Sequence, residues 1–116
     1  MIDGAHSTAD AQNLAAYLKK IKIPKYGIWA MTKNKEPDLF IKQLKGIFKK
    51  VVTMPIENEF NSVSASNLFK IATKNRFKAE KSNNLIEALN KISSNEKKLI
   101  VCFGSLYNCG NILNKN

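Results

Sequence analysis

The chain has 116 residues, 44% of them hydrophobic and 24% charged. This composition suits one globular domain, and because the sequence has no long apolar run and no basic-then-apolar leader, we expect neither a transmembrane helix nor a secretory signal. The formal net charge of +10 comes almost entirely from lysines scattered along the sequence, with Arg76 as the only arginine. Because bidentate recognition of bases and phosphates favours arginine, we expect a solvated lysine-rich surface on a cytoplasmic protein, with no nucleic acid or membrane partner.

The predicted elements alternate between strand and helix along the chain. Continuous apolar runs predict strands that are covered on both faces. Apolar residues at helical spacing, preceded by a cap or by proline, predict helices. In the first half of the chain we predict the end of a strand at Met1-Ile2, a helix from Ser7 to Lys20, a strand at 26–31, and a helix that starts at Pro37 and carries an apolar stripe including Leu39 through Phe48. In the second half we predict a strand at 51–54, a helix at 65–74, a short extended piece at 77–79, a helix from Asn83 or Asn84 through Ile92, and a strand at 99–103.

This alternation predicts an α/β fold, a Rossmann-like three-layer sandwich in which a mostly parallel sheet has helices on both faces. In such sheets, ligands bind beyond the carboxyl ends of the strands. Three polar segments follow predicted strands and are therefore candidate site segments. They are Asp3-Gly4-Ala5-His6, Thr32 to Glu36, and Gly104 to Tyr107.

Each of these segments allows a ligand-binding and a purely structural interpretation. A carboxylate such as Asp3 at a strand end can accept both hydroxyls of a ribose, and a helix start near His6 favours phosphate. The same residues can simply end the strand and pack at the helix entry, and both interpretations stay open. Lys33 and Lys35 can neutralise an anion and Ser105 can bind one, although loop lysines and Gly-Ser turns more often bind nothing.

Complete catalytic motifs are absent from the sequence. It contains no GxxxxGK[ST] phosphate loop, no GxGxxG dinucleotide fingerprint and no supported Ser/His/Asp or Cys/His set. Cys102 and Cys109 are too few for a disulfide framework and, with one histidine in the chain, for a four-ligand zinc site. We therefore expect buried thiols, no metal site, and a chain that lacks the parts of a complete catalyst.

Four segments share their order and separation with the motifs of one enzyme family. Asp3-Gly4-Ala5-His6 is similar to the family motif Asp-Gly-Ala-His-Asn, with Ser7 in the last place. Residues 31–37, which contain Lys35-Glu36, are similar to the family's strand and loop with a Lys-Asp pair and a proline. Residues 51–56 are similar to a Val-Val-Thr-x-Pro-Ile strand, and residues 104–110 are similar to a Gly-Ser-Leu-Tyr ending. Together they resemble the C-terminal domain of folylpolyglutamate synthase/dihydrofolate synthase, of the Mur ligase superfamily.

This resemblance implies a domain of an ATP-dependent amide ligase. Such enzymes use ATP and Mg²⁺ to form an acyl phosphate on dihydropteroate or a folate, which the amine of L-glutamate attacks. The phosphate loop and magnesium ligands belong to an N-terminal ATPase domain, and the C-terminal domain closes over the nucleotide. By the same resemblance, Asp3 would hold the ATP ribose, His6 would lie near the nucleotide, and Lys35, Ser105 and Tyr107 would be cleft or substrate contacts, with no catalytic residue assigned.

The resemblance also implies a partner. We expect residues 1–116 to form a single Mur ligase C-terminal-like domain without the ATPase domain, inactive alone and dependent on the ATPase domain or chain of the same ligase. Two alternatives stay open. One is a non-catalytic remnant of a disrupted gene, and the other is a stand-alone α/β module that binds a nucleotide or another anion.

Overall fold

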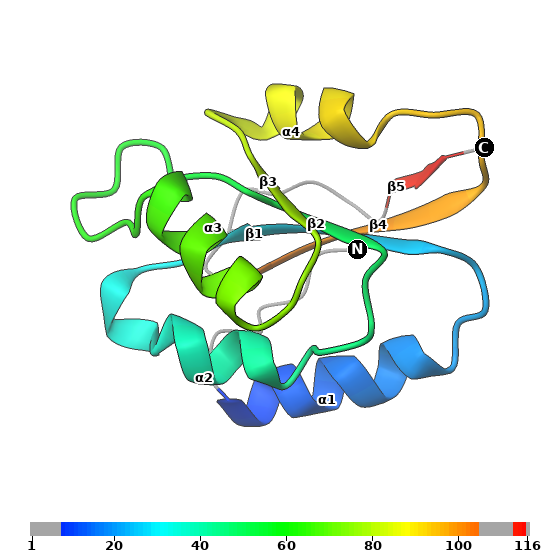
Figure 1. The fold of residues 1–116 in the computed structure, drawn as a ribbon, viewed down its shortest axis with the longest axis horizontal. Helices are drawn as coiled ribbons and strands as arrows, with labels where there is room; N and C mark the ends of the chain where they lie inside the picture. Colours follow the sequence, from blue (N-terminus) through cyan, green and yellow to red (C-terminus); the bar gives the residue numbers. More distant parts are fainter. Residues whose placement is uncertain (1–7, 105–112, 116) are drawn as a thin grey trace.

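The structure, a computed structural model, describes residues 8–104 and 113–115 and contains one mixed sheet (Figure 1). Four strands run parallel: β1 (Lys25–Ala30), β2 (Lys50–Thr53), β3 (Ala79–Lys81) and β4 (Lys98–Gly104). The sheet order is β3-β2-β1-β4-β5, and β5 (Leu113–Lys115) pairs antiparallel with β4. The predicted mostly parallel sheet is confirmed, whereas β5 was not predicted because three residues with one apolar side chain give no strand pattern.

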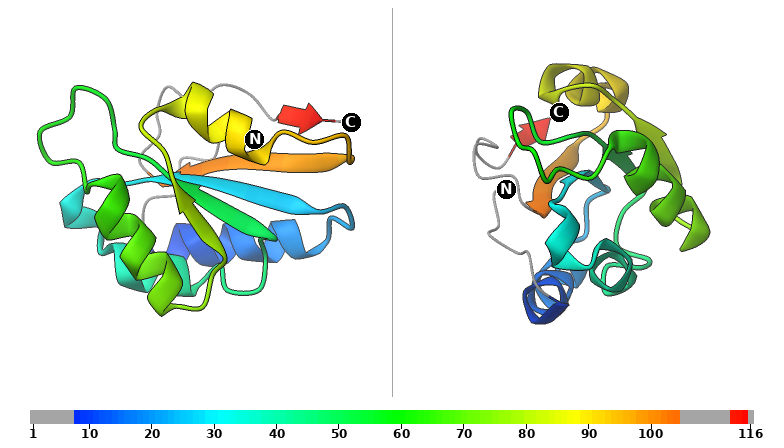
Figure 2. Two further views of the ribbon diagram at one scale, coloured as in Figure 1. Left: turned by 45° about the horizontal axis from the view of Figure 1, so that its top comes forward. Right: turned by 90° about the vertical axis from the view of Figure 1, so that its left-hand side faces the viewer.

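The helices lie on both faces of this sheet, as predicted. Helices α1 (Thr8–Lys19), α2 (Pro37–Lys42) and α3 (Ala65–Lys74) cover one face, and α4 (Leu85–Ile92) covers the other (Figure 2). Two separate clusters of buried side chains fill the spaces between the three layers. None of the described helices is long and apolar enough to cross a membrane.

Local sequence explains where these helices begin. The Ser64 hydroxyl caps α3 by accepting a hydrogen bond from the Asn67 N–H at 3.1 Å, and the Asn84 side chain caps α4 by accepting one from the Glu87 N–H at 2.8 Å. Pro37 occupies the first turn of α2, where its missing N–H costs no hydrogen bond. The predicted bounds of α3 and the predicted cap of α4 are therefore confirmed.

The helix predicted from Pro37 through Phe48 is shorter than expected. It stops after six residues, and residues 43–47 continue in turns whose backbone hydrogen bonds join residues three apart. Leu44 and Ile47 are nevertheless buried, because a spacing of three returns the chain to the same side. Leu39 is 47% exposed, so its predicted place in the apolar stripe is wrong.

Phe103 of β4 lies at the centre of the larger core. Its ring stacks with those of Trp29, Phe40 and Phe48 at centroid distances of 6.3, 6.0 and 5.2 Å. Gly27 of β1 leaves room for this ring, because a Cβ at position 27 would lie 2.6 Å from the Phe103 Cε1 atom. A close approach of this kind explains why a glycine interrupts an otherwise apolar strand.

Cys102 of β4 is buried, but it is disulfide-bonded. The expectation of a free thiol at this position is therefore wrong. That expectation relied on the small number of cysteines, since secreted disulfide frameworks usually contain more than two. The number of cysteines does not show whether two of them are close enough in space to form a bond. Cys109 lies outside the described residues.

Candidate functional site

The carboxyl ends of the four parallel strands lie together at one edge of the sheet, called here the carboxyl edge (Figure 1). A short 3₁₀ helix, η1 (Lys33–Lys35), follows β1, and a loop over residues 54–64 follows β2. The first turn of α4 follows β3, and β4 ends here at Gly104. This edge is the side on which parallel α/β sheets bind their ligands.

Backbone pairing fixes the loop after β2 against the segment after β1. The Lys33 N–H donates to the Asn61 carbonyl at 2.9 Å, and Thr32 and Ser62 form an isolated antiparallel bridge. Because two strand exits are joined in this way, η1 has a defined position on the carboxyl edge.

Lys35 is the predicted site residue that the described part of the chain contains. It is half-buried at the end of η1, and its N–H donates to the Thr32 carbonyl at 3.2 Å. The next residue, Glu36, has a left-handed φ of 51° and turns the chain into α2. The Lys35 ammonium forms no hydrogen bond or ion pair with a described residue, so its charge is free to meet an anion. The other predicted site residues, Asp3, His6, Ser105 and Tyr107, lie outside the described residues, and their placement beside Lys35 stays a prediction.

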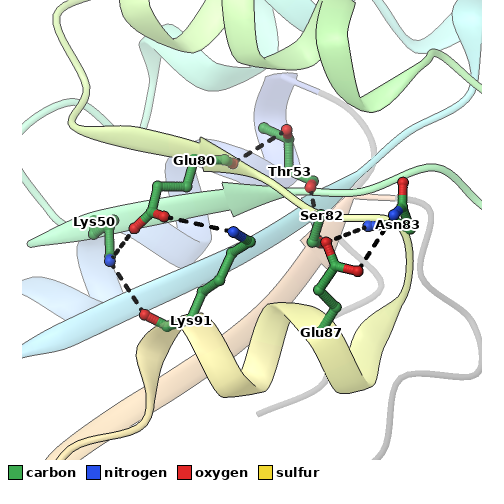
Figure 3. A network of polar contacts seen from close by, with 7 residues as sticks. All are labelled: Lys50, Thr53, Glu80, Ser82, Asn83, Glu87 and Lys91. Carbon is green, nitrogen blue, oxygen red and sulfur yellow. Dashed lines mark hydrogen bonds and ion pairs between the residues drawn. The ribbon is translucent and has the colours of Figure 1, made fainter.

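At the carboxyl ends of β2 and β3, by contrast, the polar groups stabilise the fold. The Thr53 hydroxyl donates to the Ala65 carbonyl at 2.8 Å. The buried Ser82 hydroxyl donates to the Thr53 carbonyl at 3.1 Å (Figure 3). These bonds join β2 to the start of α3 and to the end of β3. Neither hydroxyl is therefore a candidate ligand contact.

The N-terminal end of α4 carries an anion of its own. The Glu87 carboxylate accepts a hydrogen bond from the Asn83 N–H at 3.3 Å and another from the Asn83 side-chain amide at 3.3 Å (Figure 3). With the Asn84 cap, this arrangement resembles a capping box, except that Glu87 accepts from the residue before the N-cap. Because Glu87 already lies at the positive end of the helix, we do not expect a phosphate to bind there.

Two further groups at the carboxyl edge were missed in the sequence. The side chain of Phe60, in the loop after β2, is 94% exposed. The sequence feature that could have identified it is a single aromatic residue within a polar stretch. The Trp29 indole N–H is buried and has no hydrogen-bond partner among the described residues. A Cβ on Gly104 would lie 3.1 Å from the Trp29 Cδ1 atom, so this donor is close to the point where β4 ends.

A bound nucleotide needs cations near its phosphates, and its metal ion needs a cluster of oxygen, nitrogen or sulfur ligands. Lys35 offers a cation that suits phosphate. Across residues 8–104 and 113–115, no group of three or more His, Cys, Asp or Glu side chains is placed to hold a metal ion. This part of the carboxyl edge therefore fits an anion but supplies no metal site.

Comparison with known proteins decides the family. The family model described as dihydrofolate synthetase, C-terminal domain, matches residues 1–115. The chain belongs to this family. The resemblance inferred from the sequence motifs is therefore confirmed. A search of curated protein sequences found no match to this chain.

Solved structures of larger enzymes contain the same fold. Escherichia coli FolC in complex with ADP is 17% identical, with a TM-score of 0.75 over 90% of this chain and 26% of FolC. A Mycobacterium tuberculosis folylpolyglutamate synthase complexed with ADP and AMPPCP is 20% identical, with a TM-score of 0.76 over 90% of this chain and 27% of that one. The Thermotoga maritima folylpolyglutamate synthase is 22% identical, with a TM-score of 0.71 over 89% of this chain and 24% of that one. The chain thus spans about a quarter of the length of these proteins.

Proposed function

We propose that this chain works as the C-terminal domain of an ATP-dependent ligase that adds L-glutamate to dihydropteroate or a folate through an acyl phosphate. The family match over residues 1–115 carries the proposal. Its support comes from similar structures, which include a folylpolyglutamate synthase complexed with ADP and AMPPCP, and FolC in complex with DHPP and ADP.

The chemistry is divided between two domains in this proposal. An ATPase domain supplies the phosphate loop and the Mg²⁺ ligands, since the sequence of this chain contains no phosphate loop. A similar bifunctional synthase from Yersinia pestis, complexed with AMPPNP and an Mn ion, supports a divalent cation in the whole enzyme. The domain described here closes its carboxyl edge over the nucleotide, and this closure keeps water away from an acyl phosphate that water would hydrolyse.

Within this scheme the predicted site residues take specific roles. The Asp3 carboxylate accepts hydrogen bonds from the ribose hydroxyls, and His6 lies near the nucleotide. The Lys35 ammonium, which has no described partner, offsets the negative charge of phosphate or of a substrate carboxylate. Ser105 and Tyr107 contribute substrate contacts. None of these residues is assigned a catalytic role, and the domain is inactive without its partner.

Two exposed apolar side chains suit the contact between the domains. Phe60 in the loop after β2 is 94% exposed, and Ile86 in the first turn of α4 is 74% exposed. Both belong to segments that follow strands at the carboxyl edge. Because aromatic residues are enriched at protein interfaces, we propose that the ATPase domain covers this part of the edge.

Removing Asp3 is expected to weaken nucleotide binding by the assembled ligase. Hydrogen bonds to a charged group contribute about 1.5–3 kcal/mol, so Asp3→Ala should lower the affinity for ADP about tenfold or more. Lys35→Ala should lower it by a smaller factor, about threefold to fivefold, since it removes one partly solvated charge. Calorimetry with the chain joined to, or mixed with, the ATPase domain measures both effects.

Lys33→Ala provides the matched control, because Lys33 is an exposed lysine in the same short helix as Lys35. It should change the ADP affinity by less than about twofold, as expected for a solvated charge. An Asp3→Ala ligase that bound ADP as tightly as the unmodified one would contradict the proposed site. If the chain alone bound ADP as tightly as the assembled ligase, a stand-alone binding module would replace the proposal.

A further inference from the structure

Lysines that are scattered along the sequence come together at the opposite end of the sheet, called here the amino edge. They arrive there because helices of this fold run antiparallel to the strands and carry lysines in their last turns, where the helix dipole favours cations. The segments that enter the parallel strands add further lysines. The group includes Lys25, Lys49, Lys50, Lys78, Lys91, Lys97 and Lys98.

An open pocket of about 430 Å³ lies at this edge, beside the C-terminal end of α4. Its lining includes four lysines, Lys49, Lys50, Lys78 and Lys91, together with Tyr26. We call it the lysine pocket. Its volume falls within the range of about 300–1,000 Å³ that is usual for small-molecule sites.

Glu80 holds one side of the lysine pocket in place (Figure 3). Its carboxylate pairs with the Lys50 ammonium, and the Lys91 Nζ atom lies 3.8 Å from its Oε1 atom. The hydrogen bond from Lys50 keeps the pKa of Glu80 below its usual range, so this carboxylate is ionised at neutral pH. Two lysines are thus fixed side by side and share a single negative charge.

Glu96 holds the other side of the lysine pocket. It accepts a hydrogen bond from the Tyr26 hydroxyl and pairs with the Lys49 ammonium at 3.3 Å. The hydrogen bond from the Tyr26 hydroxyl lowers the pKa of Glu96, and the hydrogen bond from Lys49 lowers it to a smaller extent. The buried Lys98 ammonium lies 5.6 Å from the centroid of the Tyr26 ring, and it adds a second cation beneath this side.

The C-terminal carbonyls of α4 would repel an anion if they were free, but lysines bind them. The Lys50 ammonium donates to the Lys91 carbonyl at 3.2 Å. The Lys98 ammonium donates to the Ile92 carbonyl at 3.0 Å and to the Ser94 carbonyl at 3.4 Å. The negative end of the helix dipole is thereby offset within the fold.

Positive charge remains in excess after all these pairs. Five lysines, Lys49, Lys50, Lys78, Lys91 and Lys98, lie in or beside the lysine pocket, and among the described residues their ion pairs involve two carboxylates, those of Glu80 and Glu96. Lys78 is exposed, and its ammonium group forms no hydrogen bond or ion pair with a described residue. The lysine pocket therefore has unpaired charge and a hollow shape in the same place.

We propose that the lysine pocket binds a small polyanion that carries two or more phosphate or carboxylate groups. A ligand with several anionic groups can contact Lys78 and, at the same time, lysines held by Glu80 and by Glu96, whereas a single anionic group can reach only one of these. Oligophosphates and short oligoglutamates share this chemistry. The site is at the other end of the sheet from the carboxyl edge, so the inference does not depend on the proposed ligase activity.

Titration calorimetry on the 116-residue chain tests the inference, with tripolyphosphate in one experiment and triglutamate in the other. We expect saturable one-to-one binding of at least one of them at low ionic strength, weaker in added salt. Lys78→Gln should weaken that binding about fivefold or more, since it removes one close charge. Because the Lys78 side chain has no partner among the described residues, the variant should have the circular dichroism spectrum and melting temperature of the unmodified chain.

Lys70→Gln provides the matched control, since Lys70 is an exposed lysine of α3, on the other face of the sheet. It removes the same charge and should change the affinity by less than about twofold. Binding of tripolyphosphate alone identifies an oligophosphate site, and binding of triglutamate alone identifies a polycarboxylate site. Equal weakening by both substitutions, or no saturable binding of either probe at millimolar concentration, would overturn the inference.

Discussion

Gly104→Ala is expected to destabilise the domain by about 3 kcal/mol or more, the sum of backbone strain and a backbone clash. Gly104 has a φ of +93°, which side-chain-bearing residues rarely adopt. A Cβ at this position would lie 2.1 Å from the Ala30 carbonyl oxygen, and a backbone atom of the neighbouring strand cannot move aside cheaply. Urea unfolding followed by circular dichroism measures the loss.

Gly46→Ala separates the two causes. Gly46 also has a positive φ, of +80°, but a Cβ there would have nothing within 4 Å. Only the strain should remain, and the loss should be about 1 kcal/mol. Equal losses in the two variants would show that the contact with Ala30 has no energetic weight, and that the end of β4 is not fixed in the way described.

Phe103→Ala is expected to lower the free energy of unfolding by about 3–5 kcal/mol, the usual cost of removing a large aromatic side chain from a core. The Phe103 ring is completely buried and stacks with those of Trp29, Phe40 and Phe48. Its removal leaves a cavity between β4 and the helices on that face. Chemical denaturation at several temperatures gives the value, which is a large fraction of the roughly 5–15 kcal/mol that stabilises an ordinary domain.

Phe60→Ala removes the same atoms from the most exposed aromatic side chain described, and it serves as the control. With 94% of Phe60 exposed, the change should alter the free energy of unfolding by less than about 0.5 kcal/mol. A comparable loss in both variants would contradict the assignment of Phe103 to the core and of Phe60 to the surface.

Most of the fold could be predicted from the sequence because its signals are local. The helix at 65–74 has a serine cap and regularly spaced apolar residues, and its predicted bounds match α3. The end of α2 could not be predicted, because α-helical and 3₁₀ turns bury nearly the same positions and a buried Leu44 is compatible with either. The antiparallel pairing of β5 depends on contacts with β4 and has no local pattern.

The candidate site was predictable only in outline. The rule that ligands bind beyond the carboxyl ends of parallel strands identified the segment that contains Lys35. The same rule could not show that Ser82 and Glu87 are used within the fold, because that depends on side-chain contacts. The lysine pocket was missed for a related reason. Lysines far apart in sequence, such as Lys49 and Lys91, predicted a uniformly solvated surface, whereas the fold gathers them at the amino edge.

We propose that this domain completes a glutamate ligase when it meets an ATPase domain. The most direct measurement is the ATP-dependent incorporation of labelled L-glutamate into dihydropteroate and into a folate, with the ATPase domain of the same ligase supplied as a separate or a fused chain. We predict incorporation with one or both acceptors when the two domains are present together, and none with either alone. Two folded and associated domains that hydrolyse or bind ATP but attach no glutamate to either acceptor would contradict the claim.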